Sequence, residues 1–286
     1  MTRLPEPLVL SCASGEGSVL SHGAHALSWA PAGVQPVLFV SALTRTEVGS
    51  AVRGGVPVCF PWFGPGRSGD MEPAHGFARI TEWQLVDTGE DAQGDAFAQF
   101  LLTPQDVSGD LRNLFPREFE ARLRMSVGRR LRLELTVTNT GAETFEMEEA
   151  LHSYLRVGDC RRVTVSGFDG VSYHDKVAGQ DRTQNGDLTL TGETDAVFHH
   201  RGEVRITDPE LGRVLVVSKE GSDSTIVWNP WEEKAAGLAD LADDEWRDML
   251  CVEAGNVLGS AVRLGPGESH TLAQVVEVQE LPAAGS

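Results

Sequence analysis

The chain has 286 residues, of which 41% are hydrophobic and 23% are charged. These proportions are those of an average globular protein and exclude fibrous and disordered classes, while the length allows one large all-β domain or two smaller domains. The formal net charge of −18 repels nucleic acid and anionic lipid, because both need a basic surface. It also repels phosphorylated ligands, so a phosphate site would need a local cluster of arginines.

The sequence contains no sign of a membrane segment or of a secretion signal. No run of about 18 apolar residues occurs, and the first residues hold one arginine and only a short apolar run. We therefore expect a cytoplasmic protein. The cysteines form no pair at metal-ligand spacing, so we expect reduced, buried thiols and no metal. They are Cys12, Cys59, Cys160 and Cys251.

Alternation of apolar and polar residues is the main pattern along the chain. It runs through 122–127 and 131–138, as in antiparallel strands with one buried face. Glycine-, asparagine- and aspartate-rich turns separate the predicted strands, and helix is predicted only near 111–115 and 235–250. Many short strands favour an all-β fold, and we expect one large antiparallel β-sandwich domain over residues 1–286 with few short helices. Further short strands are predicted at 204–206, 214–217, 226–228 and 273–278.

Two neighbouring segments, Arg53–Gly64 and Pro73–Arg79, break this alternation and combine glycine, proline and aromatic residues. Glycine lets the backbone approach a ligand, proline stiffens a loop, and aromatic rings offer a flat apolar wall for a sugar. Arg53, His75 and Arg79 lie in this apolar setting, and arginine suits phosphate because its planar group donates two parallel hydrogen bonds. The residues alone fit a rigid structural loop with surface arginines equally well.

Two further segments contain candidate acid–base residues. His152 follows a strand-like run in Glu148–Leu155, and an imidazole both donates and accepts protons near neutral pH. Glu253 follows the apolar run Met249–Val252, where partial desolvation would raise its pKa and make it a better base. Taken singly, the more ordinary interpretations are a hydrogen-bonded structural histidine and an exposed glutamate at the end of a strand.

Six short motifs resemble those of a known family. In chain order, RGGVPVCFPWFG, PAHGFAR, ALHSYL, YHDK, VWNPW and CVEAGN are similar to motifs of the glucose-6-phosphate 1-epimerase family, the phosphosugar branch of the aldose 1-epimerase superfamily. Each motif alone is weak, but six in the same order are specific, and the resemblance runs from about residue 30 to about residue 280. It implies a galactose mutarotase-like β-sandwich with the sugar in a cleft on one sheet.

The resemblance also implies the roles of individual residues. His152 matches the family's acid and Glu253 matches its base, which together interconvert the anomers of a hexose 6-phosphate by opening and closing the sugar ring. Four further positions match residues that contact the substrate, with the arginines as candidates for the phosphate: Arg53, His75, Arg79 and Asp175.

No cofactor is implied, because ring opening has no redox step and needs only one acid and one base. The expected partner is a small-molecule sugar phosphate, with no nucleic acid and no membrane, and we expect a monomer, which the resemblance allows. The sequence departs from the family at Ala74, where glutamine is common, and at Ala254, where proline is common. Glu232 and Glu233 would weaken phosphate binding if they pointed into the cleft.

Three other functions compete with this interpretation. A mutarotase for unphosphorylated aldoses would use the same acid and base without a phosphate site. A non-catalytic sugar-binding protein would need aromatic walls but no acid–base pair. A glycoside hydrolase would need two carboxylates that flank the scissile bond, and no such pair stands out in the sequence.

Overall fold

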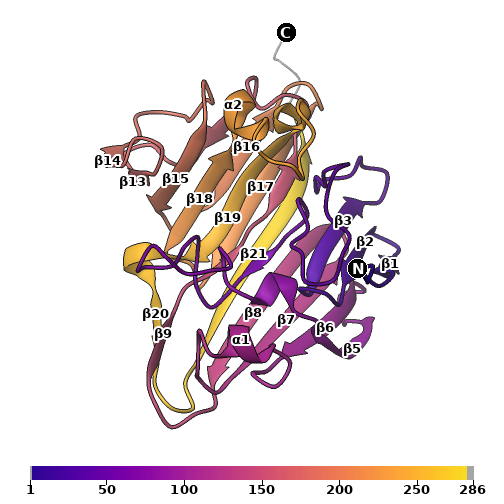
Figure 1. Cartoon of the computed structure of the whole chain (residues 1–286). Helices are drawn as coiled ribbons and strands as arrows, with labels where there is room; N and C mark the ends of the chain where they lie inside the picture. The colour runs from indigo at the N-terminus through magenta and orange to yellow at the C-terminus, as the bar shows by residue number, and fades with distance from the viewer. Residues whose placement is uncertain (1, 282–286) are drawn as a thin grey trace.

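The computed structural model describes residues 2–281, so that residue 1 and residues 282–286, the ends of the expected 1–286 domain, lie outside the described part. Two eight-stranded antiparallel sheets form most of the structure, and two smaller sheets accompany them (Figure 1). The all-β architecture predicted from the alternation is therefore confirmed.

The first of the two large sheets has β19 at its centre, and β19 is buried along its whole length. β18 pairs along one edge of β19, and β10 and β11 pair one after the other along its opposite edge. The strand order is β14 (Gln180–Thr183), β13 (Ser172–Asp175), β15 (Thr194–His199), β18 (Ser224–Asn229), β19 (Met249–Asn256), β10 (Glu149–Leu151) and β4 (Val58–Cys59), with β11 (Tyr154–Arg156) beside β19.

The second large sheet contains the strands with the clearest alternation. On β7 and β8, buried residues alternate with partly exposed ones, because one face of each strand packs into the core. All the strands predicted from the sequence lie within observed strands of the two sheets. The order is β12 (Thr164–Ser166), β16 (Val204–Asp208), β17 (Arg213–Glu220), β21 (Ser269–Glu280), β8 (Arg130–Asn139), β7 (Phe119–Val127), β6 (Ala96–Leu102) and β5 (Gln84–Glu90).

A three-stranded sheet near the N-terminus packs against β6 and β7, as the indigo strands in Figure 1 show. The buried Trp29 ring joins the two, because its Nε1–H donates to the Gly128 carbonyl at 3.1 Å. The strands are β1 (Leu8–Cys12), β2 (Gly15–Leu20) and β3 (His25–Pro31), and a separate small sheet pairs β9 (Phe145–Met147) with β20 (Val262–Leu264).

The helices are short, and the observed helices overlap the predicted segments 111–115 and 235–250 only in part. None of the helices in residues 2–281 has the length and apolar character that crossing a bilayer requires. Within the predicted 235–250 helix, only Ala235 and residues 245–248 are helical. Between them Asp240 binds Arg53, and such a tertiary contact overrides helix propensity. The helices are α1 (Gly109–Arg112), α2 (Trp231–Ala235), η1 (Ala78–Ile80), η2 (Glu245–Asp248) and η3 (Leu258–Ser260).

The buried side chain of Gln274 helps to join the two large sheets. Gln274 on β21 is almost fully buried, and its Nε2 donates to the Val252 carbonyl on β19 at 2.9 Å. Its Oε1 accepts a hydrogen bond from the Ser153 hydroxyl. Because an unpaired amide would be costly in the core, these bonds fix the first sheet against the second.

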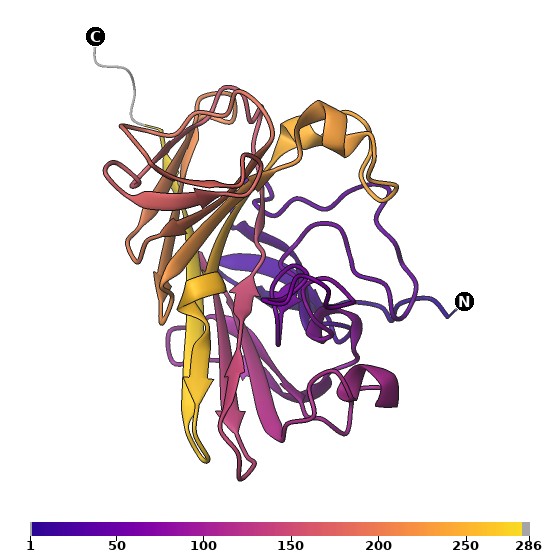
Figure 2. The same cartoon turned by 60° about the vertical axis from the view of Figure 1, so that its left-hand side comes forward.

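A long loop, residues 53–79, which also contributes the edge strand β4, covers part of the exposed face of the first sheet. Figure 2 shows the purple loops of the N-terminal part and the orange α2 on the same side of that sheet. Phe60 forms a parallel bridge with Gly76, and the His75 amide donates to the Gly64 carbonyl at 2.7 Å. Gly76 has a φ of +76° and lies so close to Phe60 that no side chain fits.

We expect Gly76→Ala to lower the free energy of unfolding more than the matched variant Gly69→Ala. Both glycines have positive φ values, which cost other residues roughly 1–2 kcal/mol. A Cβ at Gly76 would lie 2.1 Å from the Phe60 carbonyl oxygen, whereas one at Gly69 would meet nothing within 4 Å. Urea denaturation should show an additional loss of about 2 kcal/mol for Gly76→Ala. Equal losses would show that the loop is not held at Phe60.

Candidate active site

A cavity of about 290 Å³ lies between the first sheet and the 53–79 loop. The strands β15, β18 and β19 and the β10–β11 junction form its floor, and the loop and residues near α2 and β13 form its walls. The floor residues are His152, Asp195, Ile226, Trp228 and Glu253, and the loop contributes Arg53, Phe63, Ala74, His75 and Arg79. Five of the six residues that the sequence predicted for the site therefore line one cavity.

Strand register explains why His152 and Glu253 meet. β10 pairs with β19 so that Leu151 faces Ala254, and the register resumes unchanged in β11. One step further along both strands places His152 opposite Glu253. Directly opposed side chains lie on the same face of a sheet, with Cβ atoms about 4.5–5.5 Å apart. The two residues are thus neighbours although they are distant in the sequence.

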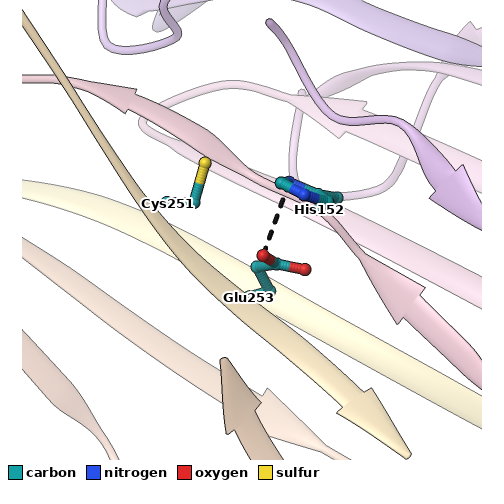
Figure 3. Close-up of side chains that lie close together, drawn as sticks. All are labelled: His152, Cys251 and Glu253. Carbon is teal, nitrogen blue, oxygen red and sulfur yellow. Dashed lines mark ion pairs between the residues drawn. The ribbon is translucent and has the colours of Figure 1, made fainter. Parts of the chain in front are cut away.

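The two side chains form a close, buried pair. His152 Nδ1 lies 3.4 Å from Glu253 Oε1, and the side chains are 8% and 0% exposed (Figure 3). Neither His152 Nδ1 nor either carboxylate oxygen has a hydrogen-bond partner within residues 2–281. Because buried polar groups are normally paired, such unpaired atoms at a cavity indicate groups that are available to a ligand.

Burial moves the pKa values of the two groups in opposite directions. It raises the pKa of Glu253 well above its ordinary value, and the nearby Asp195 carboxylate raises it further. It lowers the pKa of His152 well below its ordinary value, and the positive charges of Arg79 and Arg53 lower it further. The buried setting therefore favours the uncharged forms, a carboxylic acid beside a neutral imidazole, which together hold one proton that either group can carry.

Aromatic neighbours hold the His152 ring in place. It stacks on Tyr154 with the ring centroids 4.8 Å apart and the planes 12° apart. Trp228 and His75 meet it edge-on, with centroids at 5.9 Å and 5.6 Å. The Tyr154 hydroxyl accepts a hydrogen bond from Arg53 Nη1 at 3.0 Å, so the stack is fixed at its far end as well. The imidazole therefore keeps one orientation toward Glu253.

His75 presents a neutral imidazole to the cavity. The Gly64 amide donates to its Nδ1 at 3.3 Å, which leaves the ring proton on Nε2. Burial lowers the pKa of His75 well below its ordinary value, so the ring stays uncharged. Its φ is +67°, an uncommon conformation for a residue other than glycine that is often found at functional sites.

Four basic side chains line the cavity, in contrast to the acidic protein as a whole. Two of the wall cations are lysines that the sequence analysis did not identify. Lys176 forms an ion pair with Asp195 at 3.2 Å, and Lys234 forms one with Glu193 at 2.6 Å. The four are Arg53, Arg79, Lys176 and Lys234. The local cluster that a phosphate site needs is therefore present.

The two arginines of the cavity differ in their partners. Arg53 donates from Nε and Nη2 to the two carboxylate oxygens of Asp240 at 3.1 and 3.2 Å. Arg79 donates to the Ala74 carbonyl at 2.7 Å, its buried Nε has no partner, and it forms no ion pair within the described residues. Arg79 is thus the more available of the two for an anion.

Asp175, by contrast, does not line this cavity. Its carboxylate lies 3.2 Å from Arg182 Nε and accepts hydrogen bonds from the Val177 and Ala178 amides. The next residue, Lys176, lines the cavity instead. The structure therefore does not bring Asp175 together with the other predicted site residues.

Residues near α2 also differ from what the sequence suggested. Glu232 and Glu233 are exposed and do not line the cavity, whereas Lys234 does. The carboxylate that the sequence analysis missed is Asp195, on β15 directly opposite Trp228 of β18. No local motif marks Asp195, because only the pairing of β15 with β18 brings it to the site.

Comparisons with known proteins agree with this geometry. A model of the aldose 1-epimerase family matches residues 10–277. A protein of Escherichia coli K12 named "Putative glucose-6-phosphate 1-epimerase" is 36% identical over 83% of this chain and 79% of its own length. One of the same name from Cenchrus ciliaris is 34% identical over 86% and 76%. The chain therefore belongs to the aldose 1-epimerase family, a family of isomerases.

A solved structure supports the fold independently. The crystal structure of a protein from Salmonella typhimurium, described as a "putative mutarotase", superposes with a TM-score of 0.87 and is 32% identical. The superposition covers 95% of this chain and 90% of that one. The mutarotase-like β-sandwich implied by the sequence motifs is thus confirmed.

His25 supports the loop that carries Arg53. Its fully buried Nε2–H donates to the Gly54 carbonyl at 2.8 Å, which holds the backbone next to Arg53 against β3. Burial lowers the pKa of His25 to about 4, so the folded protein keeps this side chain neutral. The unfolded chain, with an ordinary histidine pKa of about 6.5, takes up a proton at higher pH.

This difference makes a testable contribution to the pH dependence of stability. The pKa of His25 is lower in the folded than in the unfolded protein. Its contribution to the free energy of unfolding is therefore complete above pH 6.5 and is lost as the pH falls toward 4. From pH 7.5 to pH 5, we expect the wild type to lose about 2 kcal/mol of unfolding free energy relative to His25→Leu. Urea denaturation at both pH values measures this. A constant difference between the two proteins would contradict a neutral, buried His25.

Proposed function

We propose that this protein interconverts the α and β anomers of an aldohexose 6-phosphate such as glucose 6-phosphate. The observation that carries the proposal is that His152 and Glu253 lie buried side by side at a cavity lined by basic side chains. Their facing nitrogen and oxygen atoms have no hydrogen-bond partner within residues 2–281. The names of the relatives in Escherichia coli and Cenchrus ciliaris support the choice of a glucose 6-phosphate substrate.

The reaction explains why the acid and the base must be neighbours. The O1 hydroxyl and the ring oxygen of a cyclic hemiacetal are bonded to the same carbon, C1. We propose that Glu253 removes the O1 proton while His152 protonates the ring oxygen, so that the C1–O5 bond breaks and an aldehyde forms. After rotation about C1–C2, the ring closes on the other face with the two roles reversed. Each positioned group contributes about 100- to 10,000-fold to the rate.

These roles require an ionised Glu253 and a protonated His152, which hold the same single proton as the uncharged pair. Binding of a phosphate would favour this arrangement. The charges of Arg79 and Arg53 are among the causes that lower the pKa of His152, and a phosphate beside them would offset those charges. We therefore expect the phosphorylated substrate itself to favour the protonated imidazole.

The partners of the basic residues suggest how the substrate binds. We propose Arg79 as the principal phosphate ligand, because Arg53 already binds the Asp240 carboxylate and the Tyr154 hydroxyl. Arg53 then contributes charge and holds the stacked ring of Tyr154 under His152. For the sugar hydroxyls we propose Asp195, in place of Asp175, because Asp195 lines the cavity.

The deciding experiment measures anomer exchange by NMR magnetisation transfer, for glucose 6-phosphate and for glucose at equal concentration. Acceleration for the phosphosugar alone supports the proposal. Equal acceleration for both sugars would replace it with a mutarotase for unphosphorylated aldoses. Binding without acceleration of either sugar would instead indicate a sugar-binding protein.

We expect Glu253→Gln to reduce exchange of glucose 6-phosphate by about 100- to 10,000-fold, because the amide keeps the shape of the side chain but does not accept the O1 proton. Substrate affinity, measured by calorimetry, should change little. The control is Asp175→Asn, whose carboxylate lies outside the cavity and whose variant should exchange anomers at the wild-type rate. A fully active Glu253→Gln protein would contradict the role of Glu253 as base.

We expect Arg79→Gln to raise the KM for glucose 6-phosphate by about 10- to 100-fold, because it removes a charged hydrogen bond to the phosphate. The same variant should leave any exchange of glucose unchanged. Arg67→Gln is the matched control, since Arg67 is exposed, pairs with Glu146 and does not line the cavity. A larger rise of this KM in Arg53→Gln than in Arg79→Gln would instead assign the phosphate to Arg53.

A further inference from the structure

We propose that His152, Cys251 and Glu253 form a binding site for a thiophilic divalent cation such as Zn²⁺, and that the bound ion inhibits the enzyme. One ligand atom from each residue lies within 4.8 Å of the other two, and all three side chains are buried. Figure 3 shows the three side chains gathered between the strands of the first sheet. Neither the acid–base chemistry nor the phosphate site uses the Cys251 thiol.

The sheet brings these ligands together without a sequence motif. Cys251 and Glu253 are two residues apart on β19 and therefore point to the same face. His152 reaches that face from the junction of β10 and β11, opposite Glu253. The metal-ligand spacings sought in the sequence could not detect this arrangement, because one ligand comes from a neighbouring strand.

The distances suit tetrahedral coordination. With Zn–N and Zn–O bonds of about 2.0 Å and a Zn–S bond of about 2.3 Å, the ligand atoms of a tetrahedral site lie roughly 3.3–3.8 Å apart. His152 Nδ1 and Glu253 Oε1 are already 3.4 Å apart. The Cys251 sulfur lies within 4.8 Å of one ligand atom of His152 and one of Glu253, so it needs to approach by at most about 1.3 Å.

Unpaired donors and charge balance point to the same ligand. His152 Nδ1 and both oxygens of Glu253 are buried without hydrogen bonds in the described residues, so a cation would gain three free lone pairs. Binding of the ion would release the protons of the Cys251 thiol and the Glu253 carboxyl group to solvent. The resulting thiolate and carboxylate together neutralise a divalent ion, which removes the cost of burying an uncompensated charge. Three protein ligands leave the fourth coordination position open, on the side of the cavity that His152 and Glu253 line.

Inhibition follows from the atoms that the ion would occupy. A metal on His152 Nδ1 and a Glu253 oxygen holds the lone pairs that the proposed reaction needs for proton transfer. This second step rests on the proposed function, whereas metal binding does not, so the two are tested separately.

Cadmium titration tests the site directly, because a thiolate–cadmium bond absorbs in the ultraviolet. The full-length protein, freed of metal with a chelator, should give one equivalent of this absorption. Cys251→Ala should lose it, and Cys160→Ala, which removes an equally buried thiol outside the group of His152, Cys251 and Glu253, should retain it. An undiminished signal in Cys251→Ala would overturn the proposed site.

Zinc inhibition tests the consequence. In the wild type, Zn²⁺ should suppress exchange of glucose 6-phosphate and EDTA should restore it, and Cys251→Ala should remain active with at least tenfold lower sensitivity to zinc. A protein that binds cadmium through Cys251 but never exchanges anomers would refute the proposed function and leave the site intact. An active wild type that zinc does not inhibit would overturn the inhibition.

A third measurement covers the case in which Cys251→Ala does not fold. Zinc should then shift the side-chain ¹⁵N resonances of one buried histidine in the wild type, and Glu253→Gln should weaken that shift. Unchanged histidine resonances at saturating zinc would overturn the site.

Discussion

The pairing of β19 on both of its edges is the constraint on which the site depends. β18 lies along one edge, and β10 and then β11 lie along the other. Because the register is unbroken across the junction, His152 must face Glu253, and the alternation of the strand must put Cys251 on the same face. The close His152–Glu253 contact is thus set by backbone hydrogen bonds rather than by an ion pair that the two side chains would have to form unaided.

Burial then gives this pair its chemical character. The carboxyl group and the imidazole are held where their uncharged forms are favoured, so neither is locked in a stable salt bridge. Ion pairs with Asp240, Asp195 and Glu193 neutralise part of the positive charge around the cavity. The site therefore does not contain a large excess of positive charge. Arg79, without an acidic partner in residues 2–281, is the position where an incoming anion meets the least competition.

The sequence was most informative where the pattern is local. Alternation at 122–127 and 131–138 predicted β7 and β8, because side chains point alternately in and out of any half-buried strand. The resemblance of short motifs to those of a family predicted residues that line one cavity, because the fold of that family brings the motifs together. These motifs are RGGVPVCFPWFG, PAHGFAR, ALHSYL and CVEAGN. Register between distant strands leaves no local trace, so the contribution of Asp195 and the tie between Arg53 and Asp240 could not be foreseen. Asp175 and Lys176 show the same limit, since motif matching could not tell which of two adjacent residues reaches the cavity.

The bridge that Gln274 makes between the sheets has a consequence for how the protein can vary. Its amide binds the backbone of Val252 and the hydroxyl of Ser153, each the direct neighbour of a proposed catalytic residue. The floor of the cavity is therefore tied to the core and cannot shift without disturbing both sheets. The loop wall meets the second sheet through apolar packing of Phe60 and Phe77 on Phe119 of β7, and Ala74, where the resembled motif has glutamine, lies on this wall. Evolution can thus retune which sugar is accepted at the walls while the proton-transfer geometry of the floor stays the same.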